Sequence, residues 1–330
     1  MKREWQLDYL KTFAIIMVII THIFSYNEVA PLPVIFPYLV EMAVPLFMII
    51  SGYVNTISFT KKTAEELKAG NWIHYLCSRL CVIYLPFTIL YFSEIILMDR
   101  IQKRTIGLHE AIYVFLTGGW GPGSYYIPML TQFIFCFPIL YYLVKRDLLK
   151  GSILILGVQF LFEIGVGILQ FPESWYRLLL IRYFVFIWFG IILFYYRQKI
   201  KNVIVLMMAL SGGLYIAAVS VLHFPMPIFR YWTSTSMPTV LWVGAMVMGG
   251  MHFLRRFPGV MDTVVNRIGI STYCIFLVQM AYFQLGFGKI TGSFFFNFLL
   301  GIGINCFLGI LMDDMIHKIL NRISIKSNKK

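Results

Sequence analysis

Residues 7–26, LDYLKTFAIIMVIITHIFSY, form an apolar stretch long enough to cross a bilayer as one helix. Two ionisable side chains, Lys11 and His22, interrupt it. Eleven helical residues make about three turns, so both side chains leave one face of the helix, about 16 Å apart along its axis. Ionisable groups at membrane depth are costly and mark a functional path by default. The sequence therefore predicts a functional site along this face.

The composition extends the membrane interpretation to the whole chain. Hydrophobic residues make up 59% of the 330 positions and charged residues 13%, whereas a soluble domain carries about 25% charged residues. Apolar runs of about 20 residues recur, so we expect an all-α polytopic membrane protein with about ten transmembrane helices in one bundle. The runs lie near residues 7–26, 34–58, 73–97, 125–144, 152–170, 178–196, 203–222, 237–253, 268–287 and 294–317.

The basic residues predict the orientation. Placing the N-terminus in the cytoplasm assigns about 19 of the 28 basic residues to cytoplasmic loops and about six to the opposite loops. Both termini are therefore expected in the cytoplasm. The net charge of +13 then reflects topology and attraction to anionic lipid, and the scatter of basic residues over separate loops argues against a nucleic-acid partner. The cytoplasmic set includes Lys2, Arg3, Lys61, Lys62, Lys68, Lys145, Arg146, Lys150, Arg197, Lys199, Lys201, Arg255, Arg256 and Arg267.

A single transmembrane domain over residues 1–330, with no appended soluble domain, is expected. The first apolar run is interpreted as a retained helix and not a cleaved signal peptide, because it carries Lys11 and His22. The five cysteines fall inside apolar runs, and the two that share a helix face have no histidine at ligand spacing, so no metal site is expected. The longest polar stretches are too short to bury a core: 59–71, 98–110 and 324–330.

Two loops have the composition of a binding site. Residues 117–126, TGGWGPGSYY, combine glycines with aromatic rings, and residues 223–236, HFPMPIFRYWTSTS, offer Trp232 and several hydroxyls. Tryptophan and tyrosine are also typical of the headgroup level of a membrane. The loops therefore favour either interfacial anchoring or a platform for a sugar, whose CH faces pack on flat rings.

Five short blocks then stand in the order of a known family. The first is Lys11, a ten-residue spacer and His22; the second is 44–53, VPLFMIISGY. The other three are Arg79 with 84–86 (YLP), 125–128 (YYIP) with Gln132 and Pro138, and Arg182-Tyr183 with Gly190. Together these blocks resemble acyltransferase family 3, the bacterial integral-membrane O-acyltransferases that modify cell-surface carbohydrates. The 125–138 block is most similar to relatives of the intercellular-adhesion polysaccharide system.

The resemblance implies transfer of an acyl group, commonly acetyl from acetyl-CoA, to a hydroxyl of an envelope carbohydrate or glycolipid at the bacterial inner membrane. Acetyl-CoA is then a donor substrate, and no permanently bound cofactor is expected. The chain departs from the family at three positions, with Pro45 where many members have an acidic residue, Lys11 where they have arginine, and Gln279 where histidine is frequent. These departures leave the acceptor open.

The predicted layout suits this chemistry. A neutral imidazole at His22 can take the proton of a hydroxyl as its oxygen attacks a thioester. CoA phosphates cannot cross lipid cheaply, so we expect its pantetheine arm to enter a narrow pore. Lys11 and Arg79, with Arg3 or a basic loop, are expected to hold the phosphates at the inner mouth, and Ser51 to line the site.

Several roles stay open at this stage. His22 and Lys11 are the catalytic candidates. His22 is either the general base or a satisfied intramembrane histidine. Lys11 either takes part in catalysis or organises the site, binds the donor, or extends its ammonium to the headgroups. Asp8 is expected to pair with Lys11 or to cap the helix. Glu163 either orients His22, binds sugar or pairs with an arginine such as Arg182. The further candidates for acceptor binding or site organisation are Glu41, Tyr126, Gln132, Arg182 and Trp232, and Glu94 is expected to face the interior.

Two other functions compete with the enzyme. A polysaccharide exporter or flippase would use Lys11, His22 and the glutamates to line a permeation path. A proton-coupled transporter would explain the buried ionisable groups and not the ordered family blocks. No internal repeat is visible, although inverted repeats are typical of many transporters. Membrane lipids are expected partners, and a homo-oligomer is left open.

Overall fold

The computed structural model describes residues 4–61 and 69–327, and every regular element within them is a helix. In chain order these are α1 (Trp5–Tyr26), η1 (Phe36–Val40), α2 (Ala43–Thr60), α3 (Ala69–Leu97), η2 (Met98–Gln102), α4 (Leu108–Leu116), α5 (Tyr126–Arg146), α6 (Leu148–Ile168), α7 (Glu173–Tyr176), η3 (Leu180–Tyr183), α8 (Phe184–Tyr196), α9 (Asn202–Ile216), η4 (Ala217–Val221), η5 (Thr233–Thr235), η6 (Met237–Thr239), α10 (Val240–Phe253), α11 (Val260–Ile270), α12 (Thr272–Gln284), η7 (Phe287–Lys289) and α13 (Phe294–Ser327).

The predicted all-α membrane fold is confirmed, whereas the predicted count of ten spans is not. Within the described residues, seven helical segments are long and apolar enough to cross a membrane, or eight if the α11–α12 pair is one span. Two other predicted spans form only short apolar helices, Leu180–Tyr196 and Met237–Phe253. The hydropathy of these segments predicted helices correctly, but it could not show where a helix begins late or breaks.

The apolar run predicted near 268–287 contains a break that the sequence does not indicate, because α11 and α12 meet at a bend of 73°. At the bend, Gly269 lies so close to α1 that an added Cβ would stand 2.1 Å from the Asp8 carbonyl oxygen. Ser271 donates to Asp313 of α13 over 2.9 Å. Contacts with two other helices thus hold a break that the continuous apolar sequence does not indicate.

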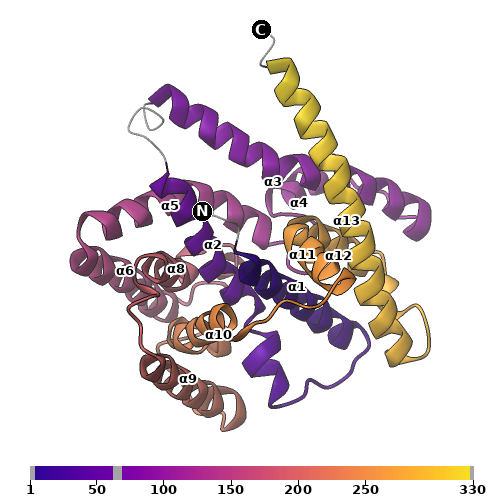
Figure 1. Ribbon diagram of the computed structural model, residues 1–330. Coiled ribbons are helices and arrows are strands. Elements are labelled where there is room, and N and C mark those ends of the chain that lie inside the picture. The colour runs from indigo at the N-terminus through magenta and orange to yellow at the C-terminus, as the bar shows by residue number, and fades with distance from the viewer. Residues whose placement is uncertain (1–3, 62–68, 328–330) are drawn as a thin grey trace.

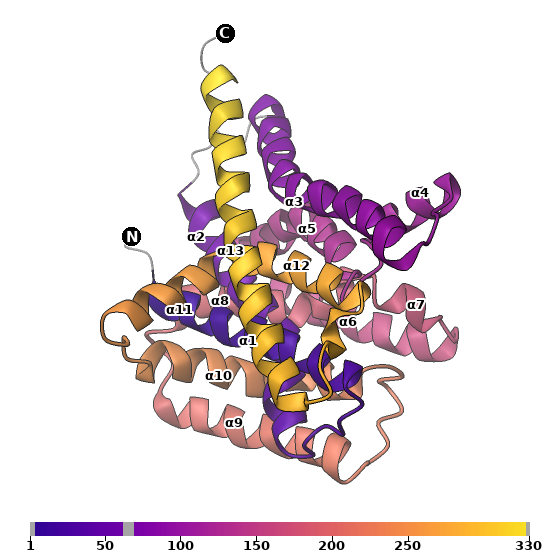
Figure 2. The ribbon, with the colours of Figure 1, turned by 90° about the vertical axis from the view of Figure 1, so that its right-hand side faces the viewer.

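The centre of the bundle is formed by α1, α2, α8 and α12, with α3, α6, α9 and α13 towards its outside (Figures 1 and 2). The most apolar windows of α1 and of the η1–α2 segment are 56% and 61% buried, whereas that of α9 is 11% buried. Helices α1, α2 and α12 also wall the cavities described below. The site therefore lies in the best-packed part of the fold.

The crossing of α2 and α8 brings two glycines of the family blocks into contact. A Cβ added at Gly52 would lie 2.4 Å from the carbonyl oxygen of Ile187, and one at Gly190 would lie 2.2 Å from that of Ile49. Only glycine permits this approach of two helix backbones. The crossing fixes α2, which carries Ser51 and Asn55, against the centre of the bundle.

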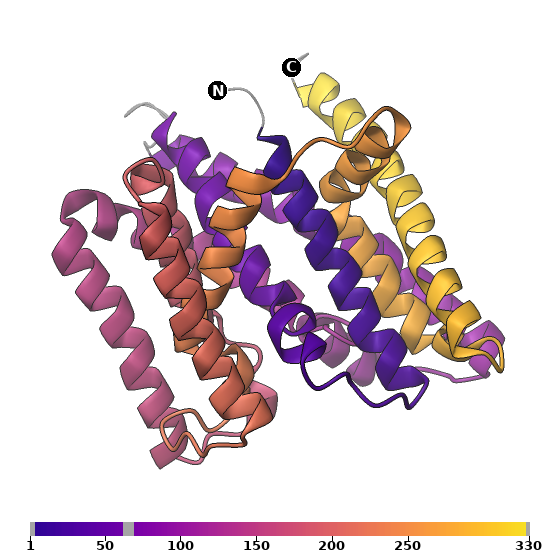
Figure 3. The same cartoon turned by 60° about the horizontal axis from the view of Figure 1, so that its bottom comes forward.

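One end of the bundle holds both the first turn of α1 and the last turns of α13 (Figure 3), and we call it the terminal side. Arg197, just after α8, pairs with Glu4 over 2.6 Å, and Tyr9 donates to Asp262 of α11 over 2.6 Å. Arg256 stands over the Trp5 ring, with 5.4 Å between its guanidinium carbon and the ring centroid, so it lies on this side together with Arg197. Of the residues used to predict the orientation, Lys2, Arg3, Lys62 and Lys68 lie outside the described residues.

Candidate functional site

The Lys11 cavity, of about 390 Å³, lies between α1, α2, α3, α5 and α12. Lys11 and Arg79 contribute its cationic groups, and Ser51 contributes a hydroxyl. The three residues predicted to bind the donor thus line one cavity, although they come from three helices. Most of the remaining wall is apolar, apart from the polar groups of Asn55, Tyr126, Thr272 and Tyr273.

The His22 cavity, of about 310 Å³, lies farther along α1 from the terminal side. Its wall joins α1 and α2 to the two loops that the sequence singled out. Side chains of Tyr125 and Tyr126 come from the first loop, and those of Trp232, Ser234 and Thr235 come from the second. The two loops that were interpreted as a possible sugar platform therefore line a cavity.

Four side chains line both cavities and form what we call the boundary cluster: Val18, Val44, Tyr126 and Phe276. The rings of Tyr126 and Phe276 lie 4.9 Å apart between centroids. Val18 stands on the helix stripe that carries Lys11 and His22, seven residues after the first and four before the second. The two cavities consequently adjoin one another along a single face of α1.

Lys11 forms an ion pair with Asp8, whose carboxylate oxygen Oδ1 lies 3.0 Å from Nζ. Asp8 is buried, and Lys11 is half-buried. The N-cap position of α1 is occupied by Glu4 and not by Asp8, and no side chain caps the helix there. Of the two roles considered for Asp8, the structure gives pairing with Lys11.

His22 packs against Phe283 of α12, with ring centroids 5.6 Å apart. Among the described residues, none gives the imidazole a hydrogen bond, and the ring lines the cavity. Glu41 lines the same cavity, and its Oε2 is buried without a partner among the described residues. Pro45, noted in the sequence as a departure from the family pattern, lies in this wall too.

Arg182 occupies an aromatic cage behind the His22 cavity. Its guanidinium carbon lies 3.7 Å from the ring centroid of Trp232, and the rings of Tyr125, Tyr176 and Tyr183 stand 4.4 to 5.8 Å away. Its Nη2 donates to the Tyr183 hydroxyl, while Nη1 is buried without a partner among the described residues. Arg182 thus stacks on Trp232, which lines the cavity, and does not line it itself.

Glu163 does not orient His22. Its two carboxylate oxygens accept from the Tyr176 hydroxyl over 3.0 and 3.1 Å. Burial, and then the Glu163 charge, raise the pKa of Tyr176 above its usual range, so the phenol stays a donor. Because Tyr176 also faces Arg182, the carboxylate supports the aromatic cage from behind.

Gln132 and Glu94 also lie outside both cavities. Gln132 donates to the Leu178 carbonyl over 2.7 Å and accepts from the Leu180 amide over 3.1 Å, so it holds the segment before α8 in place. Glu94 is buried in α3, as expected for an interior side chain. Neither residue belongs to the site.

The sequence did not single out several polar residues of the cavities. Asn55 lies one turn after Ser51 and donates to its carbonyl oxygen over 2.9 Å, and Tyr273 of α12 bonds the Ile83 carbonyl over 2.8 Å. A helical period from Ser51 would have found Asn55. Thr21, adjacent in sequence to His22, lines the His22 cavity, and so does Tyr183, which stands in the fifth family block but had no predicted role.

Gln279, noted in the sequence as a departure from the family pattern, contacts the loop before α5 and lines none of the three cavities. It is buried in α12 and donates to the Pro122 carbonyl over 3.2 Å. Gly123 follows with a φ of 87°, and an added Cβ would meet the Phe276 ring at 3.1 Å. This packing sets the start of α5 and with it Tyr125 and Tyr126.

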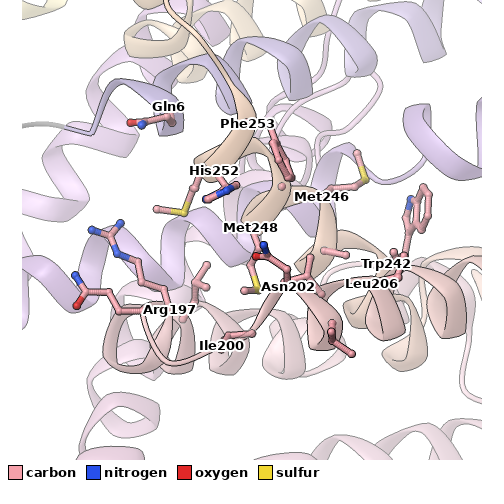
Figure 4. A pocket seen from close by; sticks show the side chains of 18 of the residues that line it. Gln6, Arg197, Ile200, Asn202, Leu206, Trp242, Met246, Met248, His252 and Phe253 are labelled. Carbon is pink, nitrogen blue, oxygen red and sulfur yellow. The ribbon is translucent and has the colours of Figure 1, made fainter.

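A larger cavity, of about 1010 Å³, lies elsewhere. It runs between α8, α9, α10 and the start of α1, with Arg197, Asn202 and His252 among mostly apolar neighbours (Figure 4). None of the predicted site residues lines it. Size alone therefore does not identify the site in this fold.

Comparison with known proteins agrees with the sequence blocks. The family described as Acyltransferase domain (Acyl_transf_3) matches residues 4–313, nearly the whole chain. No curated protein and no solved structure matches the chain significantly. The apolar helices and the family together define a membrane acyltransferase. The chain belongs to acyltransferase family 3.

Proposed function

We propose that the protein moves an acyl group, acetyl in the simplest case, from acyl-CoA to a hydroxyl of a cell-envelope carbohydrate or glycolipid. One observation carries the proposal: the Lys11 cavity and the His22 cavity adjoin on one face of α1. The first offers cations and the second offers a base among aromatic and hydroxyl groups. A donor and an acceptor that meet only at their reacting ends require two adjoining cavities of this kind, one for each substrate.

The donor occupies the Lys11 cavity in this proposal. Phosphate oxygens form their strongest hydrogen bonds with charged donors such as lysine and arginine. Lys11 spends one of its three N–H bonds on Asp8, so the ammonium keeps donors for a second anion. The positive-inside pattern supports a terminal side facing the cytoplasm of a bacterial inner membrane, where acyl-CoA is made.

The acceptor occupies the His22 cavity. The flat rings of Tyr125, Tyr183 and Trp232 suit the CH faces of a pyranose. Thr21 and Thr235 offer hydroxyls, and Glu41 offers a carboxylate oxygen that has no partner among the described residues. A polyhydroxylated ring is the ligand class that uses both kinds of contact.

The transfer follows from this arrangement. Nε2 or Nδ1 of neutral His22 takes the acceptor hydroxyl proton while the oxygen attacks the thioester carbonyl carbon. A C–O bond forms, the C–S bond breaks, and the sulfur leaves as thiolate. The imidazolium then returns the proton to the sulfur, so the products are an ester and free CoA thiol. His22 ends the cycle neutral.

The cavity sizes favour this enzyme over an exporter. About 390 and 310 Å³ are volumes of small-molecule sites, whereas a polysaccharide strand requires a continuous wide channel. The side chains of the boundary cluster lie between the two cavities, where an exporter would need an open channel.

Purified protein with labelled acetyl-CoA and a panel of envelope saccharides tests the function. We expect transfer by the parent, and a loss of roughly 10²- to 10⁴-fold in His22→Ala with acetyl-CoA affinity within about twofold. The matched control is His109→Ala, since His109 is exposed on α4. Full activity of His22→Ala contradicts the general base. Saccharide crossing vesicles without any acyl-CoA binding establishes the exporter instead.

A further inference from the structure

The boundary cluster stands where the reacting carbonyl has to be. The attacking oxygen must lie within hydrogen-bonding distance of the His22 imidazole, and the carbonyl carbon within about 3.5 Å of that oxygen. The sulfur arrives from the Lys11 cavity, so the carbon lies between the two. Val18 stands one helical turn, about 6 Å, from His22 and about 10 Å from Lys11, on the same stripe.

The chemistry of the cluster matches an acyl chain. Val18, Val44 and Phe276 present methyl groups and a ring face, and Tyr126 adds a second ring. Val18 and Phe276 are nearly fully buried, at 8% and 7% exposure. Phe276 is further fixed by Tyr126 on one side and by Gly123 on the other. Packed side chains of this kind do not yield easily to an extra methylene.

From this placement we propose that the boundary cluster is the acyl-binding site, and that Val18, Val44 and Phe276 set an upper limit on acyl-chain length. The inference rests on the proposed function, since it requires an acyl-CoA donor. The site takes a short acyl group such as acetyl. Longer chains have to displace side chains that neighbouring helices hold in place.

The energetic cost of an acyl chain that is too long for its site has a known magnitude. One methylene too many in a tight apolar site lowers the specificity constant by about tenfold or more. We therefore expect the parent to prefer acetyl-CoA over butyryl-CoA by at least about 100-fold in kcat/KM. The affinity for CoA itself stays the same for all donors, because phosphates and pantetheine bind in the Lys11 cavity.

Two widening variants and one narrowing variant test the limit. Val44→Ala removes two methyl groups, so we expect butyryl transfer to rise by about tenfold or more relative to acetyl. Phe276→Leu moves the preference in the same direction. Val44→Ile adds one methylene, and it is expected to lower acetyl kcat with an unchanged affinity for CoA.

The control is Val243→Ala in α10, because Val243 is a fully buried valine that lines none of the three cavities. It should keep the chain-length profile of the parent. Acyl transfer with the same profile in Val44→Ala, Phe276→Leu and the parent overturns the acyl site and leaves the proposed function standing. No transfer by the parent from any acyl-CoA removes the function, and the acyl site with it.

Discussion

Lys11 and Asp8 form an ion pair across one turn of α1, with 3.0 Å between Nζ and Oδ1, at the wall of the cavity that also contains Arg79. Asp8 is nearly fully buried, at 3% exposure, so the lysine compensates a charge that the protein has removed from water. The ammonium therefore has a structural role, and a donor-binding role has to be separated from it by experiment.

A double substitution makes that separation. Lys11→Ala should lower the melting temperature and weaken acetyl-CoA binding by about 10- to 100-fold, the range for one hydrogen bond to a charged group. Adding Asp8→Asn removes the carboxylate that Lys11 pairs with, so part of the lost melting temperature should return while the affinity for acetyl-CoA stays low. Recovery of both quantities would assign Lys11 a structural role only.

Tyr126 is the one member of the boundary cluster with a hydrogen-bond donor on its side chain, and no described residue accepts from its hydroxyl. We expect this hydroxyl to donate to the thioester oxygen as negative charge develops there. Tyr126→Phe should then lower kcat by roughly 10²- to 10³-fold, equally for every acyl chain. Binding of acetyl-CoA, measured by calorimetry, should change little.

Tyr84→Phe provides the comparison for that experiment. Tyr84 bonds Thr131 over 2.9 Å and lines neither the Lys11 nor the His22 cavity, so its loss should leave the rate within about twofold. A Tyr126→Phe variant with the parental rate would exclude the phenol from the reaction.

The stacking of Arg182 on Trp232 predicts an effect on acceptor binding. A planar guanidinium stacks on indole and an ammonium does not, so Arg182→Lys should raise KM for the saccharide by about tenfold with donor affinity unchanged. Trp232→Ala should have a similar effect, and the double variant should be no worse than either single one. Additive effects would show that the two side chains act separately.

The glycine contact of α2 and α8 predicts a stability effect with an internal control. Gly190→Ala forces a Cβ to within 2.2 Å of the Ile49 carbonyl oxygen, which should cost about 1–3 kcal/mol or more. Gly157 of α6 has no neighbour within 4 Å of its added Cβ, so Gly157→Ala should stabilise by about 0.5–1 kcal/mol. Thermal unfolding in one detergent compares the two, and equal shifts would contradict the close crossing.

The sequence predicted the membrane class and much of the proposed site, for identifiable reasons. Hydropathy reports burial in lipid or protein, and the period of a helix places Lys11 and His22 on one face. Neither signal contains information on how other helices approach. The bend between Ile270 and Thr272 therefore went unpredicted, because contacts with α1 and α13 produce it.

The buried polar residues were the hardest to assign. Gln132 and Glu163 have the same polar character as the cavity residues, yet each is engaged by backbone or by a tyrosine of a neighbouring segment. Glu41, in contrast, reaches the His22 cavity. A sequence shows that such a residue needs a partner, whereas only the fold identifies that partner.

The two cavities differ in what builds their walls. The Lys11 cavity is enclosed by helices that pack on one another, whereas Trp232, Ser234 and Thr235 reach the His22 cavity from a surface connection between α9 and α10. Replacement of that connection does not require the helices to move. Under the proposed function, a change in this connection alters the acceptor and leaves the donor site as it is, so a graft of residues 223–236 from another member of the family should transfer acceptor preference alone.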